Sequence, residues 1–256
     1  MDVIPVSPLE ALLPGLRAST SLLLLLDYDG TLVLHADRPE LAYPDPTLLD
    51  LLRRLCARAG TEVHIVSGRT AAFLETWLAG LPLYLHAEHG ALSKGPGESR
   101  WARRKLPAPD WHEAVRPVLA EWVERTPGTA IELKETGLAW HWRAARNDDG
   151  EREADALAGR LEAVLRAHPV EILRGDMVLE LRPRGVHKGL ISGPHAVRTP
   201  GRMVLAAGND LSDEELFQAL AGSAITIVVG ARPSMARYRV PDVATLRQFL
   251  GRILEE

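Results

Sequence analysis

Cysteine is almost absent from this chain, whose 256 residues include only Cys56. A disulfide framework needs pairs of cysteines, so the sequence excludes a disulfide-stapled scaffold and favours a reducing compartment. Cys56 lies in an amphipathic run at residues 46–60, where we expect a small core or half-buried side chain.

Long apolar segments are lacking as well. The five consecutive leucines at 22–26 are far fewer than the ~20 apolar residues that a membrane-spanning helix needs. The first twenty residues carry Asp2 and Glu10, and they lack the basic start and long apolar run of an export signal. The sequence therefore predicts no membrane partner and a cytoplasmic location.

An excess of positive charge is also missing. The chain has 30 Lys and Arg residues against 34 Asp and Glu residues, with a formal net charge of −4 and a pI near 6.2. No basic stripe interleaved with aromatic residues is present, so we expect no nucleic-acid partner. Only Lys94, Lys105, Lys134 and Lys188 are lysines, which makes each of them informative, because lysine and arginine are not interchangeable chemically.

What the chain does have is an alternation of apolar runs and helical patterns. The run "SLLLLL" (21–26) is typical of a strand buried on both faces, as in parallel sheets. Further strands are expected at 62–66, 81–87, 202–208 and 225–230, and helices at 46–60, 71–80, 212–222 and 243–256. This alternation predicts an α/β fold with a Rossmann-like open parallel sheet.

The middle of the chain has a different order. Residues 107–185 contain a helical pattern, two strand patterns, a second helical pattern and two more strand patterns. The order α-β-β-α-β-β predicts a small antiparallel sheet with two helices on one face. We therefore expect an α/β core made of residues 1–106 and 186–256, with an α+β domain, residues 107–185, inserted into it.

Polar residues follow several of the expected core strands. Asp27 and Asp29 come directly after the leucine run, Ser67 follows the next strand, and Asn209-Asp210 follow the strand at 202–208. In open α/β sheets ligands bind beyond the carboxyl ends of the strands. Two close carboxylates repel each other unless a cation lies between them. Oxygen ligands without a His/Cys cluster favour Mg²⁺.

The two aspartates also suggest a reaction. A carboxylate such as Asp27 can attack phosphorus without first losing a proton, giving an aspartyl-phosphate. Asp29, two residues on, can protonate the leaving alcohol and later deprotonate the attacking water. Gly30 permits a sharp turn, and Thr31 can hydrogen-bond the phosphoryl group or the loop.

These residues carry a resemblance to a known superfamily. The pattern Asp27-x-Asp29-Gly30-Thr31, Ser67, Lys188 and the segment 208–213 resembles, in order, the four signature motifs of the haloacid dehalogenase superfamily, with a cap domain inserted between the second and third motifs. Transport ATPases of that superfamily carry Thr where Asp29 stands. The resemblance therefore implies a phosphatase that turns over by water.

A narrower resemblance is to the trehalose-6-phosphate phosphatase family. It is carried by "VSGR" (66–69), "AEHG" (87–90), "ELKETGLAWHWR" (132–143), "VLELRPRGVHKG" (178–189) and "GNDLSDEELF" (208–217). The resemblance implies a small-molecule sugar phosphate as substrate, and we favour a monomer. It implies that Ser67 and Lys188 hold the phosphoryl oxygens. The implied substrate-binding residues are Arg69, His89, Glu132, Lys134, Arg143, Glu180 and Arg182, and the implied Mg²⁺ ligands are Asp27, Asp29 through its main-chain carbonyl, Asn209, Asp210 and Asp213.

The sequence departs from the family pattern at three places. Asn209-Asp210 stand where two acids are frequent, His187 where Asn is common and Trp142 where Tyr is frequent. The sequence leaves open whether Asn209 or Asp210 faces the metal, and whether Asp213 binds it directly or through water. Related sugar phosphates (glucosylglycerol phosphate, mannosylglycerate phosphate or sucrose phosphate) and a non-catalytic phosphosugar-binding module remain alternatives.

Several of these residues also have an ordinary structural interpretation. Ser67 could cap the helix that follows it. Arg69 could form an ion pair, and His89 could be a buried, hydrogen-bonded histidine. Glu132 and Lys134 could form an exposed salt-bridged pair on one strand face. The remaining histidines show no metal-ligand spacing and are expected on the surface or in the core.

Overall fold

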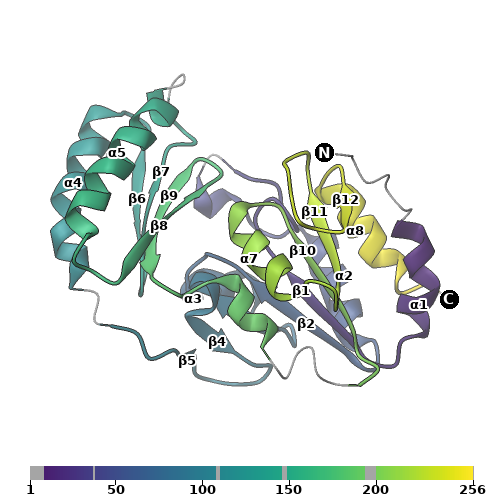
Figure 1. The fold of residues 1–256 in the computed structure, drawn as a ribbon. Helices are drawn as coiled ribbons and strands as arrows, with labels where there is room; N and C mark the ends of the chain where they lie inside the picture. Colours follow the sequence, from purple (N-terminus) through teal and green to yellow (C-terminus); the bar gives the residue numbers. More distant parts are fainter. Residues whose placement is uncertain (1–8, 37, 108–109, 146–148, 194–199, 256) are drawn as a thin grey trace. The chain divides into compact units, whose positions relative to one another are not determined.

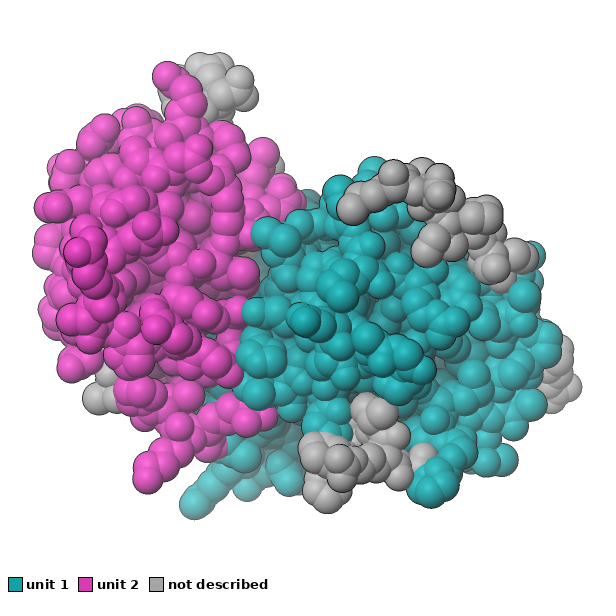
Figure 2. Space-filling model, in the orientation of Figure 1, with its two compact units in different colours: residues 1–35, 42–102, 187–256 teal, residues 36–41, 103–186 magenta. Residues whose placement is uncertain are grey.

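The computed structural model describes residues 9–36, 38–107, 110–145, 149–193 and 200–255. They form two compact units, which are coloured separately in Figure 2: unit 1 comprises Met1–His35, Ala42–Ala102 and His187–Glu256, and unit 2 comprises Ala36–Leu41 and Arg103–Val186. The expected division at 107 and 185 differs from this grouping in that residues 36–41, 103–106 and 186 belong to unit 2. None of the described helices is both long and apolar enough to cross a membrane.

Unit 1 is built on an eight-stranded sheet with the order β12-β11-β10-β1-β2-β3-β4-β5 (Figure 1). Neighbouring strands from β12 to β3 pair in parallel, and β4 joins β3 antiparallel. The strands are β1 (Leu22–Leu26), β2 (Thr61–Val66), β3 (Tyr84–Ala87), β4 (Leu92–Lys94), β5 (Ala102–Arg103), β10 (Met203–Gly208), β11 (Ile225–Val229) and β12 (Tyr238–Val240). The predicted Rossmann-like core is confirmed.

The leucine run forms the interior strand β1, and all five leucines are completely buried. Its side chains alternate between the two faces of the sheet. Leu23 and Leu25 pack on one face with Leu216 and Phe217 of helix α7 (Leu211–Ala219). A strand that buries both faces has no polar side, which explains five leucines in a row.

The other described helices of unit 1 precede, connect or follow the parallel strands. They are α1 (Leu13–Ala18), α2 (Pro46–Ala57), α3 (Ala71–Leu78) and α8 (Val243–Arg252), with short 3₁₀ turns η1 (Leu9–Leu12), η3 (Glu88–Gly90) and η4 (Lys188–Ser192). Side-chain caps at Asp45, Thr70 and Asp242 fix the starts of α2, α3 and α8. The sequence pattern did not predict α1 or the two- and three-residue strands β4, β5 and β12.

Unit 2 has the predicted order α-β-β-α-β-β. Its elements are α4 (Trp111–Arg125), β6 (Ala130–Leu133), β7 (Leu138–His141), α5 (Asp149–Leu165), β8 (Val170–Gly175) and β9 (Val178–Pro183). The sheet order is β6-β7-β9-β8, and every pairing is antiparallel. A short 3₁₀ turn, η2 (Pro39–Leu41), also belongs to this unit.

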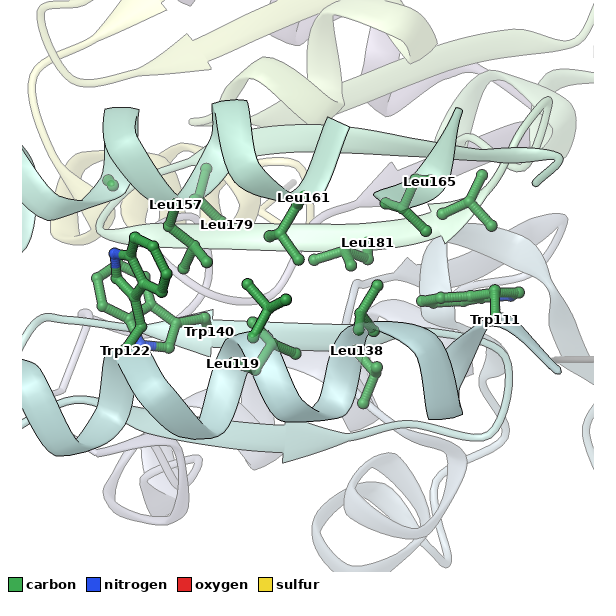
Figure 3. Packing of buried hydrophobic residues seen from close by; sticks show 14 of the residues in the cluster. Trp111, Leu119, Trp122, Leu138, Trp140, Leu157, Leu161, Leu165, Leu179 and Leu181 are labelled. Atoms are coloured by element: carbon green, nitrogen blue, oxygen red, sulfur yellow. The ribbon is translucent and has the colours of Figure 1, made fainter. Parts of the chain in front are cut away.

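The core of unit 2 lies between its two helices and one face of its sheet (Figure 3). Trp140 of β7 is completely buried there, and Leu179 and Leu181 of β9 point to the same side. Because strand side chains alternate, the residues between these apolar positions point to the opposite face. That opposite face carries the charged residues described below.

Candidate active site

The turn that follows β1 places two aspartates beside each other. Main-chain N–H groups of Gly30 and Leu32 donate to Val33 O at 2.7 Å and Tyr28 O at 2.8 Å, which closes the turn. Gly30 has a φ of 73°, and a Cβ there would overlap the side chains of Asn209 and His35, so only glycine fits. Thr31 is completely buried.

Asp27 lies at the end of β1 and is buried among charged groups. Its Oδ1 accepts a hydrogen bond from Lys188 Nζ at 2.6 Å, and its Oδ2 accepts one from Thr31 Oγ1 at 2.9 Å. Burial, followed by repulsion from Asp213, raises the pKa of Asp27 to about 7, although Lys188 acts in the opposite direction. Asp27 is therefore a carboxylate whose charge the site itself stabilises poorly.

Lys188 is shared by two buried carboxylates. It begins η4, and its Nζ donates to Asp213 Oδ1 at 2.8 Å as well as to Asp27. Burial alone would lower the pKa of Lys188, but Asp213 and Asp27 outweigh burial and raise it above its usual range. Asp213 is completely buried, and its Oδ2 accepts from the main-chain N–H groups of Asn209 and Asp210 at 3.0 Å each. Two acids and one lysine leave one negative charge in excess.

Asp29 forms a bidentate ion pair with Arg69. Arg69 Nε donates to Asp29 Oδ2 at 2.7 Å and Arg69 Nη2 donates to Oδ1 at 2.5 Å. The guanidinium also lies 4.1 Å from the ring centre of Phe73. In this structure the ion-pair interpretation of Arg69 is the one observed, and its contact with substrate stays a prediction.

Ser67 and His89 lie on adjacent turns at the carboxyl ends of β2 and β3. Ser67 is buried, and its Oγ accepts from Arg69 N at 3.1 Å, while its carbonyl accepts from His89 N at 2.9 Å. Glu88 and His89 both adopt left-handed backbone conformations. Thr70, not Ser67, caps α3, since its Oγ1 accepts from Phe73 N at 3.3 Å. The Ser67 hydroxyl therefore does not serve as the helix cap.

Asn209 and Asp210 have different surroundings. Asp210 is the N-cap of α7, where it forms a capping box with Asp213, and its Oδ1 accepts from Arg232 Nη1 at 2.6 Å. The side-chain amide of Asn209 instead points toward Asp27 and Asp29. The amide atom on that side lies 2.7 Å from the Asp29 main-chain oxygen and 3.1 Å from Asp27 Oδ2. Of the two residues, Asn209 is the one beside Asp27.

These contacts bear on the expected metal site. Among the described residues, no three or more His, Cys, Asp or Glu side chains form a metal-binding group. The atoms that converge are one carboxylate oxygen, one main-chain carbonyl and one amide, and such oxygen donors suit Mg²⁺. The carboxylate of Asp210 pairs with Arg232, and that of Asp213 binds Lys188 and main-chain N–H groups at the start of α7. The donor set of Asp27, Asp29 and Asn209 therefore fits the cation.

Unit 2 gathers a second set of predicted residues on the sheet face opposite its core. Glu132 and Glu180 lie in one row of the sheet, on either side of Ala139. Lys134 pairs with Glu180, and both side chains are buried. Glu132 Oε2 lies 2.8 Å from His141 Nε2. Burial would raise the pKa of Glu132, but Lys134 and the hydrogen bond from His141 lower it below its usual value.

The two remaining predicted arginines behave differently from each other. Arg182, next but one to Glu180, is buried and donates through Nε to Glu171 Oε1 at 2.8 Å. Arg143 Nη2 donates to the Asp176 carbonyl at 2.8 Å and to its carboxylate at 2.7 Å. Asp176 lies in the β8–β9 turn, so the structure does not join Arg143 to the Glu132–Lys134–Glu180 group.

Sequence reasoning missed two neighbours of these sites. His141 was assigned to the surface or the core, although its position between Trp140 and Trp142 puts it on the face of Glu132. His35, on the loop after Thr31, lies with Nε2 3.1 Å from Asn209 Nδ2. No local spacing connects His35 with Asn209, because 174 residues separate them.

The fold is shared with solved hydrolases. A haloacid dehalogenase-like hydrolase from Bacteroides thetaiotaomicron, 16% identical, superposes with a TM-score of 0.61 over 91% of this chain and 99% of that chain. At this identity the likeness concerns the fold. The chain therefore has the fold of a haloacid dehalogenase-like hydrolase, with unit 2 as the inserted domain.

Closer relatives narrow this class. The family model described as trehalose-phosphatase matches residues 25–244, so the chain belongs to the trehalose-phosphatase family. The C-terminal domain of the C. albicans trehalose-6-phosphate phosphatase is 28% identical, with a TM-score of 0.90 over 98% of this chain and 97% of that one. A bifunctional trehalose-6-phosphate synthase/phosphatase of Thermoproteus tenax is 40% identical over 231 residues, which are 90% of this chain and 32% of that protein. The chain thus spans about a third of the length of that relative.

Proposed function

We propose that this chain is a Mg²⁺-dependent phosphatase that hydrolyses trehalose 6-phosphate to trehalose and inorganic phosphate. One observation carries the proposal: the buried Asp27 carboxylate lies between Lys188 and Thr31 at the carboxyl end of β1, two residues before Asp29, in a chain of the trehalose-phosphatase family. The site has a nucleophile, Asp27, a second acid two residues on, and the positive charge of Lys188 beside the nucleophile.

In the first half-reaction Asp27 attacks phosphorus and the bond to the sugar oxygen breaks, giving an aspartyl-phosphate and an alkoxide that takes its proton from Asp29. In the second half-reaction Asp29 takes a proton from water, whose oxygen displaces Asp27 and releases phosphate. In the structure both carboxylate oxygens of Asp29 accept hydrogen bonds from Arg69, and a guanidinium can only donate. Arg69 must therefore release at least one oxygen before Asp29 can carry a proton.

Two other side chains act on the phosphoryl group. Lys188 and Ser67 neutralise and hold its non-bridging oxygens, a role suited to a transition state whose charge is spread over those oxygens. Asp27, the Asp29 carbonyl and the Asn209 amide oxygen hold the cation. When bound, Mg²⁺ supplies positive charge to a phosphoryl oxygen.

We assign sugar selectivity to unit 2. Glu132, Lys134 and Glu180 form one charged group on the sheet face opposite the helices, and carboxylates and an ammonium can hydrogen-bond sugar hydroxyls in both directions. Each charge-assisted hydrogen bond that is lost costs about 1.5–3 kcal/mol, or roughly 10- to 150-fold in kcat/KM. Alanine variants at these positions lose that much with trehalose 6-phosphate and keep most of their slow turnover of p-nitrophenyl phosphate. Equal losses on both substrates would contradict this assignment.

The deciding experiment is phosphate release by the purified chain with Mg²⁺. Trehalose 6-phosphate is compared with sucrose phosphate, glucosylglycerol phosphate and mannosylglycerate phosphate at equal concentrations. We expect the highest kcat/KM with trehalose 6-phosphate and no turnover by Asp27→Asn. A higher kcat/KM with another ester would make that ester the substrate in place of trehalose 6-phosphate. No phosphate release from any ester would favour a non-catalytic phosphosugar-binding module.

A further inference from the structure

The side-chain amide of Asn209 lies between hydrogen-bond acceptors on both sides: the oxygens of Asp27 and Asp29 on one side and a ring nitrogen of His35 on the other. On one side the Asp29 carbonyl oxygen and Asp27 Oδ2 lie 2.7 and 3.1 Å from one amide atom. On the other side Nδ2 lies 3.1 Å from His35 Nε2. An amide has an acceptor at one end and a donor at the other, so rotation by 180° exchanges what it presents to the aspartates.

Only one of the two orientations is compatible with a cation. With Nδ2 toward His35, the amide oxygen joins the Asp29 carbonyl and Asp27 Oδ2, and three oxygens converge. With the amide reversed, its N–H groups donate to those same two oxygens and accept no cation. A carboxylate at position 209 would present oxygen in both orientations. The amide therefore creates a need for orientation that an acid would not have.

We infer that His35 is a positioning residue that selects the cation-binding orientation of Asn209. In the neutral imidazole tautomer that carries its proton on Nδ1, Nε2 accepts a hydrogen bond from Asn209 Nδ2. That bond turns the amide oxygen toward Asp27 and the Asp29 carbonyl. The inference rests on the proposed cation site and adds to it the one side chain that makes a neutral ligand usable there.

The surroundings of His35 support a specific contact. Its Nε2 approaches the Gly30 Cα so closely that a Cβ at residue 30 would overlap both His35 and Asn209. The side chain of His35 otherwise lies on an exposed loop, so its replacement should leave the core of unit 1 intact. Partners that orient a metal ligand typically contribute 10- to 100-fold to metal affinity.

The test is Mn²⁺ affinity of the chelator-stripped chain, measured from the signal of free Mn²⁺ by electron paramagnetic resonance, at one pH near 8. Phe at position 35 fills similar space and cannot accept a hydrogen bond, whereas Gln can accept through Oε1. We expect His35→Phe to weaken Mn²⁺ binding by about 10-fold or more, and His35→Gln to stay within about threefold of wild type because it restores the acceptor. Circular dichroism and thermal unfolding check that both variants fold.

A second background separates orientation from other effects of the loop. In Asn209→Asp the ligand has no wrong orientation, so adding His35→Phe should change Mn²⁺ affinity by less than about twofold. Unchanged affinity in His35→Phe alone, or an equal loss in both backgrounds, would overturn the inference. Wild-type protein that binds no Mn²⁺ at millimolar concentration would instead overturn the proposed cation site, and the role of His35 with it.

Discussion

Replacing Asp27, the proposed nucleophile, by Asn should stabilise the metal-free protein while it abolishes turnover. Asp27 is buried beside Asp213, and its pKa is raised from an ordinary 3.8 to about 7. Asn is nearly isosteric: its oxygen can accept from Lys188, and its amide can donate to the Thr31 hydroxyl. The variant Asp27→Asn therefore keeps both hydrogen bonds and removes the charge that the folded site stabilises poorly.

The size and the pH dependence follow from proton linkage. A carboxyl whose folded pKa is raised binds its proton more tightly in the folded chain than in the unfolded chain. Ionised Asp27 therefore lowers the free energy of unfolding as the pH rises from near 4 through about 7, and the cost is constant above that. At about 1.4 kcal/mol for each pKa unit, the full cost is about 4 kcal/mol. Asp27→Asn should recover much of it at pH 8 and little at pH 4.

Urea unfolding with a chelator present, at pH 8 and at pH 4.5, measures this difference. The matched control is Asp50→Asn on the exposed surface of α2, where the side chain is 59% exposed and forms an i,i+3 ion pair with Arg53. The control should change the free energy of unfolding by less than about 0.5 kcal/mol. If Asp27→Asn were no more stable than wild type at pH 8, or equally stabilised at both pH values, the account of Asp27 as a strained charge would be refuted.

Three further predictions follow from the same site and sheet. Lys188→Met leaves Asp27 and Asp213 buried without their lysine and should lose about 3–5 kcal/mol of unfolding free energy at pH 8. The double variant Lys188→Met/Asp27→Asn should be more stable than Lys188→Met. Equal or lower stability would contradict the role of Lys188 as the shared partner of the two aspartates. Burial and the charge of Arg202 lower the pKa of His64 to about 4, so His64 stays neutral in the folded chain, whereas the unfolded chain takes up a proton there below about pH 6.5. Between pH 7.5 and pH 5 the wild type should therefore lose about 2 kcal/mol more unfolding free energy than His64→Gln. Parallel stability curves for the two proteins would contradict this. Exhaustive chelation should abolish phosphate release and added Mg²⁺ should restore it, so full activity after metal removal would exclude the proposed cation.

Much of the fold was determined by sequence pattern alone. Five leucines in a row can only be a strand if both faces are covered, and alternation with helical patterns then requires a parallel sheet. In the inserted domain, Trp140 and Trp142 alternate with His141, which sets one face of β7 toward the helices. The elements that escaped prediction, such as β4 and β12, have three residues each, and so few residues carry no measurable periodicity.

The candidate site was determined only in part. The motif spacing singled out Asp27, Asp29, Ser67 and Lys188 as candidates. Asp27, Asp29 and Ser67 follow parallel strands, whose carboxyl ends meet at one edge of the sheet. The spacing could not say which partner each side chain takes. Lys188 reaches back 161 residues to Asp27, and Arg69 reaches 40 residues to Asp29, so these ion pairs exist only once the strands are in order.

Tertiary structure also decided between neighbours in the sequence. Asn209 and Asp210 are adjacent, and either could have faced Asp27 as far as the sequence goes. The start of α7 separates them: Asp210 takes the N-cap position, where its side chain must serve the helix, and Asn209 turns toward the aspartates and His35. The sequence determined which chemical groups arrive at the edge of the sheet, and the helix start and the packing around it decided which of them face one another.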